Sequence, residues 1–507
     1  MEGLEVSEVL FSNFIKDNEK FRIDSDFFTK ENLHAYEKIK SKPYVLFSEI
    51  IDTLTDYHAN GSYENLKKVV ELLDEKSFAY MVRSTDLEKR EFNEGVKFIT
   101  KEAYDSLPKT KLFGGELLIN KIGTPGRSYL MPTLNIPASV GMNLFMIRLK
   151  AKAKFKESFI WAFLSGKIGQ TIILRKVNGT VPLTIDKEAI RTIYIPEISL
   201  YLQEKIDAII KLSEKMLKDS RVNYNNASQI LTSLFFNSPQ DYLDKKRSTV
   251  KFFASSFKLT GRLDAEYYQP KYEEMVNRIS AQPHARLTDL VTIQKSIEPG
   301  SDAYTDDDGL PFLRVADYDK LGISTPQKRL NSIFSNEHFE KLEALKPKKG
   351  TILFSKDGSV GEAFCLREDA DFITSGAILH LSIRNKQKIL PEYLTLALNS
   401  ILVRTQAERD AGGSIILHWR VDEIKNVLIP LVDITTQQKI SSLVQKSFSF
   451  KSESERLLDV AKRAVEIAIE QDEAAGLAYI QEQTTIQDVL AAEVHESCYS
   501  CQRIEED

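Results

Sequence analysis

GTILFSKDGSVG, at Gly350–Gly361, has a counterpart in GELLINKIGTPG, at Gly115–Gly126. Glycine stands at the first, ninth and twelfth places of both stretches, and lysine stands at the seventh. A short apolar run bounded by glycine predicts a β-strand that enters a tight turn. The chain therefore contains the same strand and turn twice.

The repetition extends well beyond this strand and turn. Gly350 lies 235 positions after Gly115, and other segments recur in the same order at nearly the same spacing. These segments are RIDSDFF and RLDAEYY (Arg22–Phe28, Arg262–Tyr268), YMVRSTDL and PFLRVADY (Tyr80–Leu87, Pro311–Tyr318), and an Ile-Pro-x6-Gln-x2-Ile signature (Ile195–Ile206, Ile429–Ile440). A single shared motif can arise by chance, but an ordered set at so long a period indicates a duplicated domain with its connector.

Two long helices are predicted, because more than thirty residues without proline or glycine follow Gln203 and again Gln437. Along both segments, apolar residues and serines recur in steps of four and three, and the two series match nearly place for place. Such a seam is typical of helices that pack against each other. The residues expected to pair the helices are Ile206, Ile210, Leu217, Tyr224, Leu231, Leu234, Ile440, Val444, Leu458 and Val465.

The seam allows two arrangements: each helix could cap its own domain, or the two could pack as an antiparallel coiled coil. We favour the coiled coil, because a helix of this length spans roughly 50 Å, more than one small domain needs. The coiled coil would form a rod with a domain at each end, and a pseudo-twofold axis would relate the two halves. The rod would be a little longer than one turn of B-DNA, which is about 34 Å.

The fold class expected is α+β, with two similar globular mixed α/β domains separated by the paired helices. The expected segments are residues 1–200 and 241–435 for the domains, 201–240 and 436–475 for the helices, and 476–507 for an acidic tail that could be flexible.

Composition indicates a globular protein of more than one domain: 507 residues, 42% of them hydrophobic and 28% charged. Three cysteines cannot form a disulfide framework, and the N-terminus has neither a basic start nor a long apolar run. No apolar run is long enough to span a bilayer. We therefore expect a soluble cytoplasmic protein. The net charge of −5 argues against nucleic-acid binding unless basic groups cluster locally.

The sequence lacks the motifs of several catalysts. Sixteen prolines are present and no two are adjacent, which excludes the Pro-Pro loop of an adenine methyltransferase. In GTILFSKDGSVG the lysine precedes the second glycine and Asp357 follows it, so the stretch is a poor phosphate-binding loop, and its glycines are better explained by positive-φ turns. His495, Cys498 and Cys501 have partial metal spacing but lack a fourth ligand. We therefore predict no catalytic residue and no metal in this chain.

The ordered double set of motifs resembles one family, the specificity (S) subunits of type I restriction-modification systems. The resemblance covers nearly the whole chain, from about Phe11 to about Ala475. It implies that each domain reads one half of a split target in double-stranded DNA, while the helices fix the gap and dock two methyltransferase (M) subunits. It further implies restriction (R) subunits in the complex, S-adenosylmethionine in the M subunits, ATP and Mg in the R subunits, and no cofactor or catalysis in this chain.

Strands and turns that carry cations with small polar residues suit a nucleic-acid groove, because small residues admit the backbone and cations neutralise phosphate. The candidates in the first half are Lys109, Lys111, Lys121, Thr124, Arg127, Arg175, Lys176, Asn178 and Thr180. Those in the second half are Lys346, Lys348, Lys349, Lys356, Ser359, Ser414, His418 and Arg420. For the lysines from Lys346 to Lys349, a solvated loop is an equal alternative, and Trp419 is expected in the core.

Arg83 and Arg314 hold equivalent places and could read guanine through two hydrogen bonds each. A salt bridge to Asp86 and to Asp317 is the alternative for both. The segments that follow these arginines differ between the two halves, so we expect an asymmetric target. An interpretation of another class stays open: a coiled-coil scaffold whose two heads bind protein, which the net negative charge favours.

Overall fold

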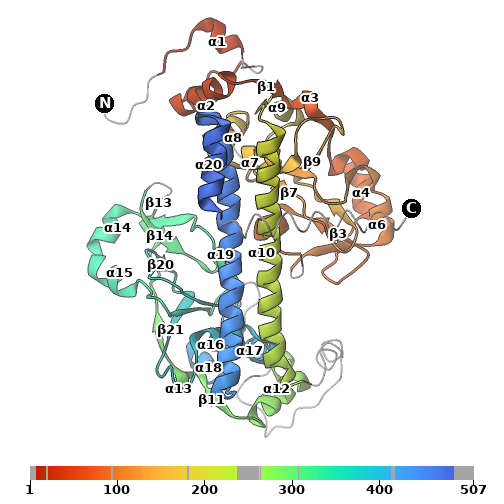
Figure 1. Cartoon of the computed structure of the whole chain (residues 1–507). Helices are drawn as coiled ribbons and strands as arrows, with labels where there is room; N and C mark the ends of the chain where they lie inside the picture. The colour runs from red at the N-terminus through yellow and green to blue at the C-terminus, as the bar shows by residue number, and fades with distance from the viewer. Residues whose placement is uncertain are drawn as a thin grey trace. The chain divides into compact units, whose positions relative to one another are not determined.

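The computed structural model (Figure 1) describes residues 7–236 and 262–484, apart from residues 17, 19, 20, 93, 94, 180, 181, 263, 306, 307 and 413–416. The described chain divides into two units. The first unit combines the residues up to Lys215 with those from Glu453, and the second is Met216–Ser452. The boundary falls inside both long helices, α10 (Leu200–Ser233) and α19 (Ile434–Glu470), whereas the expected segments gave each helix a segment of its own.

The first unit contains two four-stranded sheets. The turn sheet, so called because it carries the glycine turn, is antiparallel throughout, in the order β2 (Ile51–Asp56), β9 (Leu144–Leu149), β6 (Leu117–Asn120), β7 (Ser128–Leu130). The second sheet has the order β4 (Lys97–Ile99), β3 (Ala79–Val82), β8 (Ala138–Val140), β5 (Lys111–Leu112), in which β3 and β8 are parallel. All four residues of β6 are buried, as a continuous apolar run predicts.

Helices and a short ladder complete the first unit. The ladder pairs β1 (Tyr44–Leu46) with β10 (Tyr194–Pro196). The helices are α1 (Phe11–Lys16), η1 (Ser25–Phe28), α2 (Lys30–Lys40), α3 (Phe47–Ile50), η2 (Tyr57–Asn60), α4 (Tyr63–Val69), α5 (Ser84–Lys89), α6 (Lys101–Asp105), η3 (Pro108–Thr110), α7 (Glu157–Ser165), α8 (Lys167–Arg175) and α9 (Lys187–Arg191).

The second unit repeats this topology. Its turn sheet has the order β12 (Val291–Lys295), β21 (Ile378–Ile383), β18 (Ile352–Ser355), β19 (Ala363–Cys365). Its second sheet has the order β13 (Tyr304–Thr305), β17 (Lys328–Leu330), β14 (Leu310–Leu313), β20 (Ile373–Thr374), with β14 and β20 parallel. In this second sheet one strand differs: β5 lies beside β8 in the first unit, whereas β13 lies at the opposite edge, beside β17.

The second unit also has its own helices and short strands. They are η6 (Ala265–Tyr268), α12 (Pro270–Ser280), β11 (His284–Arg286), α13 (Leu287–Leu290), η7 (Ser301–Ala303), η8 (Val315–Asp317), β15 (Tyr318–Asp319), β16 (Gly322–Ile323), α14 (Ser332–Glu337), α15 (Phe339–Leu345), α16 (Pro391–Asn399), α17 (Ile401–Asp410), α18 (Val421–Lys425) and β22 (Leu428–Pro430).

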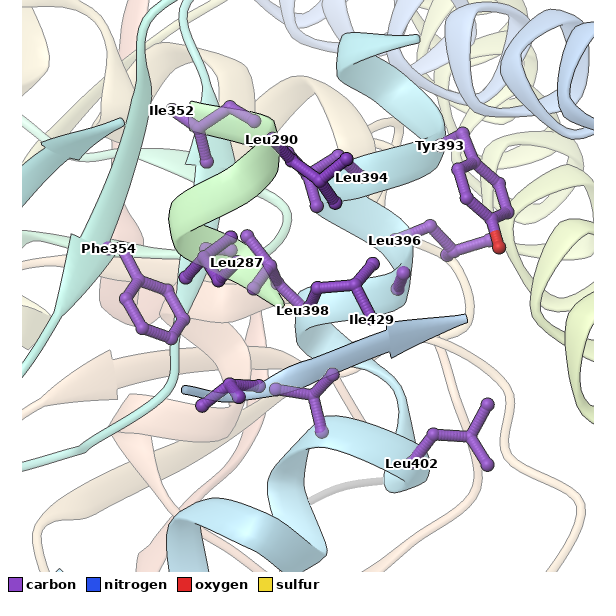
Figure 2. Packing of buried hydrophobic residues seen from close by; sticks show 14 of the residues in the cluster. Leu287, Leu290, Ile352, Phe354, Tyr393, Leu394, Leu396, Leu398, Leu402 and Ile429 are labelled. Atoms are coloured by element: carbon purple, nitrogen blue, oxygen red, sulfur yellow. The ribbon is translucent and has the colours of Figure 1, made fainter. Parts of the chain in front are cut away.

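The core of the second unit lies between its turn sheet and its helices. Figure 2 shows Leu287 of α13, Phe354 of β18 and Leu398 of α16 packed together, and all three are fully buried. Burying each such side chain contributes roughly 1.5–3 kcal/mol. Leu231 from α10 and Ile440 from α19 belong to the same cluster, so segments of both long helices complete this core.

Buried serines pair the two helices in each unit. In the first unit, Ser213 Oγ lies 2.9 Å from Ser454 Oγ and donates to the Ser454 carbonyl at 2.8 Å. In the second unit, Ser220 Oγ lies 3.1 Å from Ser447 Oγ. Within the first unit, the Ser199 amide, just before α10, donates to Glu473, just after α19, whereas Ser213 further along α10 meets Ser454 earlier in α19, so the pairing is antiparallel. This confirms the predicted antiparallel pair of helices and the two mixed α/β domains, and the pseudo-twofold relation of the domains stays a prediction.

Three residues of the predicted seam are less buried than expected, and one of them, Leu217 on α10, is half-buried. Leu234 follows the last residue of α10 and is 49% exposed. Leu458 is only half-buried, because its neighbour Leu457 takes the fully buried place. A strict seven-residue step drifts around a helix that has 3.6 residues per turn, and this drift explains why Leu457 and not Leu458 is fully buried.

The recurring glutamine of the Ile-Pro signature has the same role in both units. Gln203 accepts a hydrogen bond from Lys156 N at 2.8 Å and donates to the carbonyls of Lys154 and Ile198. Gln437 makes the three matching bonds to Leu390 N and to the carbonyls of Lys388 and Val432. Each buried amide therefore fastens the start of a long helix to the loop before α7 or α16.

The Arg-x-Asp motif at the start of each repeat is also structural. Arg22 pairs with Asp24 at 2.7 Å and donates to the carbonyl of Val177, just after α8. Arg262 pairs with Asp264 at 2.8 Å and donates to the carbonyl of Asp410, where α17 ends. Each motif thus ties the beginning of a repeat to the end of a distant helix.

The expected flexible tail begins instead with a packed helix, α20 (Glu473–Gln483). Gly476 lies so close to α19 that a Cβ there would be 2.9 Å from the Ala464 carbonyl oxygen, and Ile480 is buried. The acidic average of residues 476–507 concealed this apolar beginning. Residues 485–507, with His495, Cys498 and Cys501, lie outside the described residues. Among the described residues, no helix has the length and apolarity needed to cross a bilayer.

Candidate nucleic-acid interface

A glycine turn joins two antiparallel strands in each unit, β6 to β7 and β18 to β19. Its last glycine takes a φ of +88° at Gly126 and +85° at Gly361, and its amide donates to the carbonyl of the residue that ends the first strand. A phosphate-binding loop leads from a strand into a helix. These turns do not, so the glycines serve the positive-φ turn, as predicted.

A second loop lies along each turn. In the first unit, Thr184 forms isolated bridges with Ile122 of the turn and with Asn178. In the second unit, His418 forms the matching bridges with Asp357 and Gly412. The predicted residues that these contacts bring together are Lys121, Thr124, Arg127 and Asn178 in one unit and Lys356, Ser359, His418 and Arg420 in the other. Thr180 and Ser414 lie outside the described residues.

The lysine of the first turn is held by a carboxylate from a distant strand. Lys121 Nζ lies 2.7 Å from Asp56 Oδ2, and Lys187 Nζ lies 3.0 Å from Asp56 Oδ1. Burial raises the pKa of Asp56, but its hydrogen bonds and charge interactions with the two lysines bring it below the usual value. Lys121 is only 14% exposed, so the structure does not leave it free to face DNA.

The lysine of the second turn pairs with its own neighbour. Lys356 forms an ion pair with Asp357, and His418 Nδ1 lies 2.8 Å from the other oxygen of that carboxylate. Lys356 is 20% exposed, whereas His418 is 64% exposed. Trp419 is buried beside the turn, its ring centroid 5.7 Å from that of Phe354, which confirms its predicted place in the core.

Arg83 and Arg314 both form the salt bridge that was the alternative to guanine reading. Arg83 Nη2 lies 2.6 Å from Asp86 and also donates to the Gly95 carbonyl. Arg314 Nε lies 3.5 Å from Asp317. Both carboxylates are buried and accept the backbone amide of their arginine, so the pairs fix the local chain. A base contact from either arginine stays a prediction.

The remaining predicted lysines lie away from the turns. Lys109 and Lys111 precede β6, and Lys346, Lys348 and Lys349 precede β18, so these residues are at the opposite strand end from the turn. Lys111 lies 4.3 Å from the ring centroid of Tyr104, while Lys346 pairs with Glu343. Lys348 is 3.5 Å from Asp369 and stays largely exposed.

Arg175 and Lys176 are buried, which corrects their prediction as DNA contacts. The Arg175 guanidinium stacks 3.9 Å from the ring centroid of Phe27, and its Nε donates to the Phe27 carbonyl at 2.8 Å. Lys176 Nζ donates to Thr192 Oγ1 at 2.6 Å. Arg175 falls on the inward face of α8, with Ile168 and Ile172, and helical spacing could have indicated this.

Sequence reasoning missed the partners that hold the turn lysines. Asp56 and Lys187 lie more than sixty residues from Lys121 on either side, and no local motif links them. They meet because Asp56 ends β2, an edge strand of the turn sheet, and Lys187 begins α9, just after the loop that bridges to the turn. Among the described residues, no group of three histidine, cysteine, aspartate or glutamate side chains could hold a metal ion.

Part of the chain matches a known family model. Residues 284–459 match the family model for the type I restriction modification DNA specificity domain. The specificity subunit of the type I restriction enzyme EcoBI from Escherichia coli is 25% identical over 167 residues, which are 32% of this chain and 33% of that protein. The matched segment thus spans about a third of that relative.

Two solved structures are also similar. The S subunit of a type I restriction-modification system from M. genitalium has a TM-score of 0.34 and 11% identity, covering 87% of this chain and 96% of that one. The HsdS subunit from Thermoanaerobacter tengcongensis has a TM-score of 0.25 and 14% identity, with coverages of 87% and 97%. The family model and the curated relative confirm the resemblance that the repeated motifs predicted.

Proposed function

We propose that this chain, a type I restriction-modification specificity subunit by family, reads the two halves of an asymmetric DNA target, one half with each unit. The observation that carries the proposal is the repetition of one turn sheet with unlike side chains. Both units present a glycine turn beside a second loop, but Ile122 and Thr184 stand in one where Asp357 and His418 stand in the other. Equal backbones with unequal side chains suit two related half-sites of different sequence.

Local charge at the turns supports DNA as the ligand despite the net charge of −5. Arg127 follows the last glycine of the first turn and is 56% exposed, and Arg420 follows Trp419 and is 74% exposed. Each pairs with one glutamate, Glu88 or Glu423, and because the arginine of each pair is largely exposed, we expect phosphate to replace the glutamate readily. These arginines would position the duplex, and the loop residues would read it.

The paired helices would dock two methyltransferase subunits, and restriction subunits would join through them. S-adenosylmethionine would be bound by the methyltransferase subunits, and ATP and Mg by the restriction subunits. This chain would contribute no catalytic residue. Exposed apolar side chains on α10, such as Tyr201 and Val222, suit a surface that a partner covers.

A scaffold whose heads bind protein is the second candidate, and one observation favours it. Within the described residues near the turns, Lys121, Lys356 and Arg127 each face a carboxylate, which lowers the local positive potential. The two functions differ in their response to salt, because phosphate contacts release counterions. A DNA reader assembled with its methyltransferase should lose affinity steeply as salt rises, whereas a protein-binding head should not bind DNA at all.

The decisive experiment maps methylated adenines across the host genome, with and without this gene, by single-molecule sequencing. Loss of one split, asymmetric motif on deletion is the expected result. An unchanged map, with the methyltransferase expressed, would overturn the DNA-reading function in favour of the scaffold.

A further inference from the structure

We infer that His418 is a base-reading residue of the second unit, whose Nε2 accepts a hydrogen bond from the exocyclic amine of adenine or cytosine. The inference rests on the proposed DNA-reading function and assigns one contact within it. Three features of the second unit support it. The backbone around His418 is fixed, its imidazole is exposed, and the Asp357 carboxylate of the glycine turn contacts the imidazole.

The backbone around His418 is fixed on both sides. The His418 amide donates to the Gly412 carbonyl at 2.7 Å, and its carbonyl accepts from the Gly412 amide at 3.0 Å. On the other side, the Gly358 amide donates to the Leu417 carbonyl and the Trp419 amide to the Lys356 carbonyl. Trp419 is buried, which anchors the segment in the core. A side chain on such a ladder is preorganised for recognition.

Asp357 sets the chemistry of the imidazole. Its Oδ1 lies 2.8 Å from His418 Nδ1, and because a carboxylate only accepts hydrogen bonds, Nδ1 must carry the proton. In the neutral ring Nε2 is then a bare acceptor. The other oxygen of Asp357 binds Lys356, which neutralises the carboxylate and holds it in place. An acidic side chain on a DNA-facing turn, otherwise unfavourable, is explained by this positioning role.

A bare acceptor distinguishes bases in the major groove. Adenine N6 and cytosine N4 present donors there, whereas guanine and thymine present oxygen acceptors at the corresponding places. An Nε2 acceptor therefore favours adenine or cytosine on the contacted strand. The first unit has Ile122 and Thr184 at the matching bridge, so the device belongs to one half-site only.

The test uses the full chain expressed with its methyltransferase in the host, and the readout is the methylated motif. His418→Ala should weaken the preference for adenine or cytosine at one position of one half-site by about tenfold or more. Asp357→Asn is the sharper variant, because the new amide can donate to Nδ1 and move the ring proton to Nε2. The preference at that same position should then shift towards guanine or thymine.

The outcomes separate this inference from the function on which it rests. Thr184→Ala, the matched variant in the first unit, should leave the His418 half-site unchanged, and Trp419 fluorescence checks the fold of each variant. The inference fails if His418→Ala and Asp357→Asn leave the motif intact, or if they lower methylation equally at every sequence, as a phosphate contact would. A wild-type gene that produces no split motif overturns the DNA-reading function itself.

Discussion

The two units place a lysine at the same position of the turn and hold it in different ways. In the first unit, Asp56 on β2 binds Lys121 from across the sheet. In the second, Asp357 of the turn itself binds Lys356. The strand register puts Lys295 where the first unit has Asp56, because Asp56 faces Phe145 on β9 and Lys295 faces the equivalent Leu379 on β21.

The carboxylates of Asp56 and Asp357 thus come from different places in the chain, but both pair with the lysine of the turn. A lysine this shielded from water needs a counter-charge nearby, so the fold retains one. The lysine and its carboxylate are scaffold, and the groups free to vary are those bound to the far side of that carboxylate, Lys187 in one unit and His418 in the other. This explains how one backbone can present two different surfaces.

The prediction with the largest expected effect tests whether the stability of the second unit depends on α10, the long helix of the first repeat. Leu231 of α10 is fully buried in the core of the second unit, so Leu231→Glu should cost that unit more than about 4 kcal/mol. Leu234→Glu, three residues on and half exposed, should cost less than about 0.5 kcal/mol. The chain has two tryptophans, so denaturant unfolding in a Trp161→Phe background reports Trp419 and the second unit alone. Equal losses would contradict this packing.

The next prediction tests whether the glutamine signature stabilises the two units equally. Gln203→Ala and Gln437→Ala each remove three hydrogen bonds and leave buried backbone groups unpaired, so each should cost its own unit about 3 to 4 kcal/mol. The exposed neighbour Gln438→Ala is the control and should change little. Tryptophan fluorescence on urea unfolding measures each unit separately. A large effect in one unit only would show that the shared signature has different roles.

Acid sensitivity should distinguish the units. His380 on β21 is buried against Thr374, and burial lowers its pKa to about 4, whereas Met146 holds the same register position on β9. Below pH 6.5, His380 is protonated in the unfolded chain but stays neutral in the folded unit. The stability of the second unit therefore falls as the pH drops from 6.5 towards 4. The second unit should lose about 3 kcal/mol over this range. His380→Met should flatten the profile of urea midpoints against pH; an unchanged slope would assign it to other groups.

Repetition made the fold predictable. The glycine turn, the long helix and the glutamine signature each occur twice. They could be predicted because local periodicity does not depend on residues that are distant in sequence. The antiparallel helix pair followed from the matching seams. What failed depended on partners remote in sequence. Arg175 has the charge of a surface residue but stacks on Phe27 more than a hundred positions earlier, and the ion pair of Lys121 needs Asp56.

The edge strands were not predicted, and the helix at the start of the tail was missed, for a related reason. Nothing local decides whether a two-residue strand such as β5 or β13 joins one edge of a sheet or the other, because the choice rests on the neighbouring strands. The helix α20 was concealed by the acidic residues after it, and its burial depends on Gly476 meeting α19. The candidate site was therefore predicted as a region and not as a set of free side chains.

The smallest expected effect compares the two carboxylates directly. Asp56 is buried and holds two lysines, so Asp56→Asn should destabilise the first unit by about 1 to 2 kcal/mol, as loss of charged hydrogen bonds does. Asp357 is 18% exposed, but its partner His418 is 64% exposed and Asp357 holds only one lysine, so Asp357→Asn should cost the second unit less than about 1 kcal/mol. Asp52→Asn, an exposed position on β2, is the control. Tryptophan-resolved urea unfolding measures both, and a larger loss from Asp357→Asn would mean that its carboxylate supports the fold as well as orienting His418.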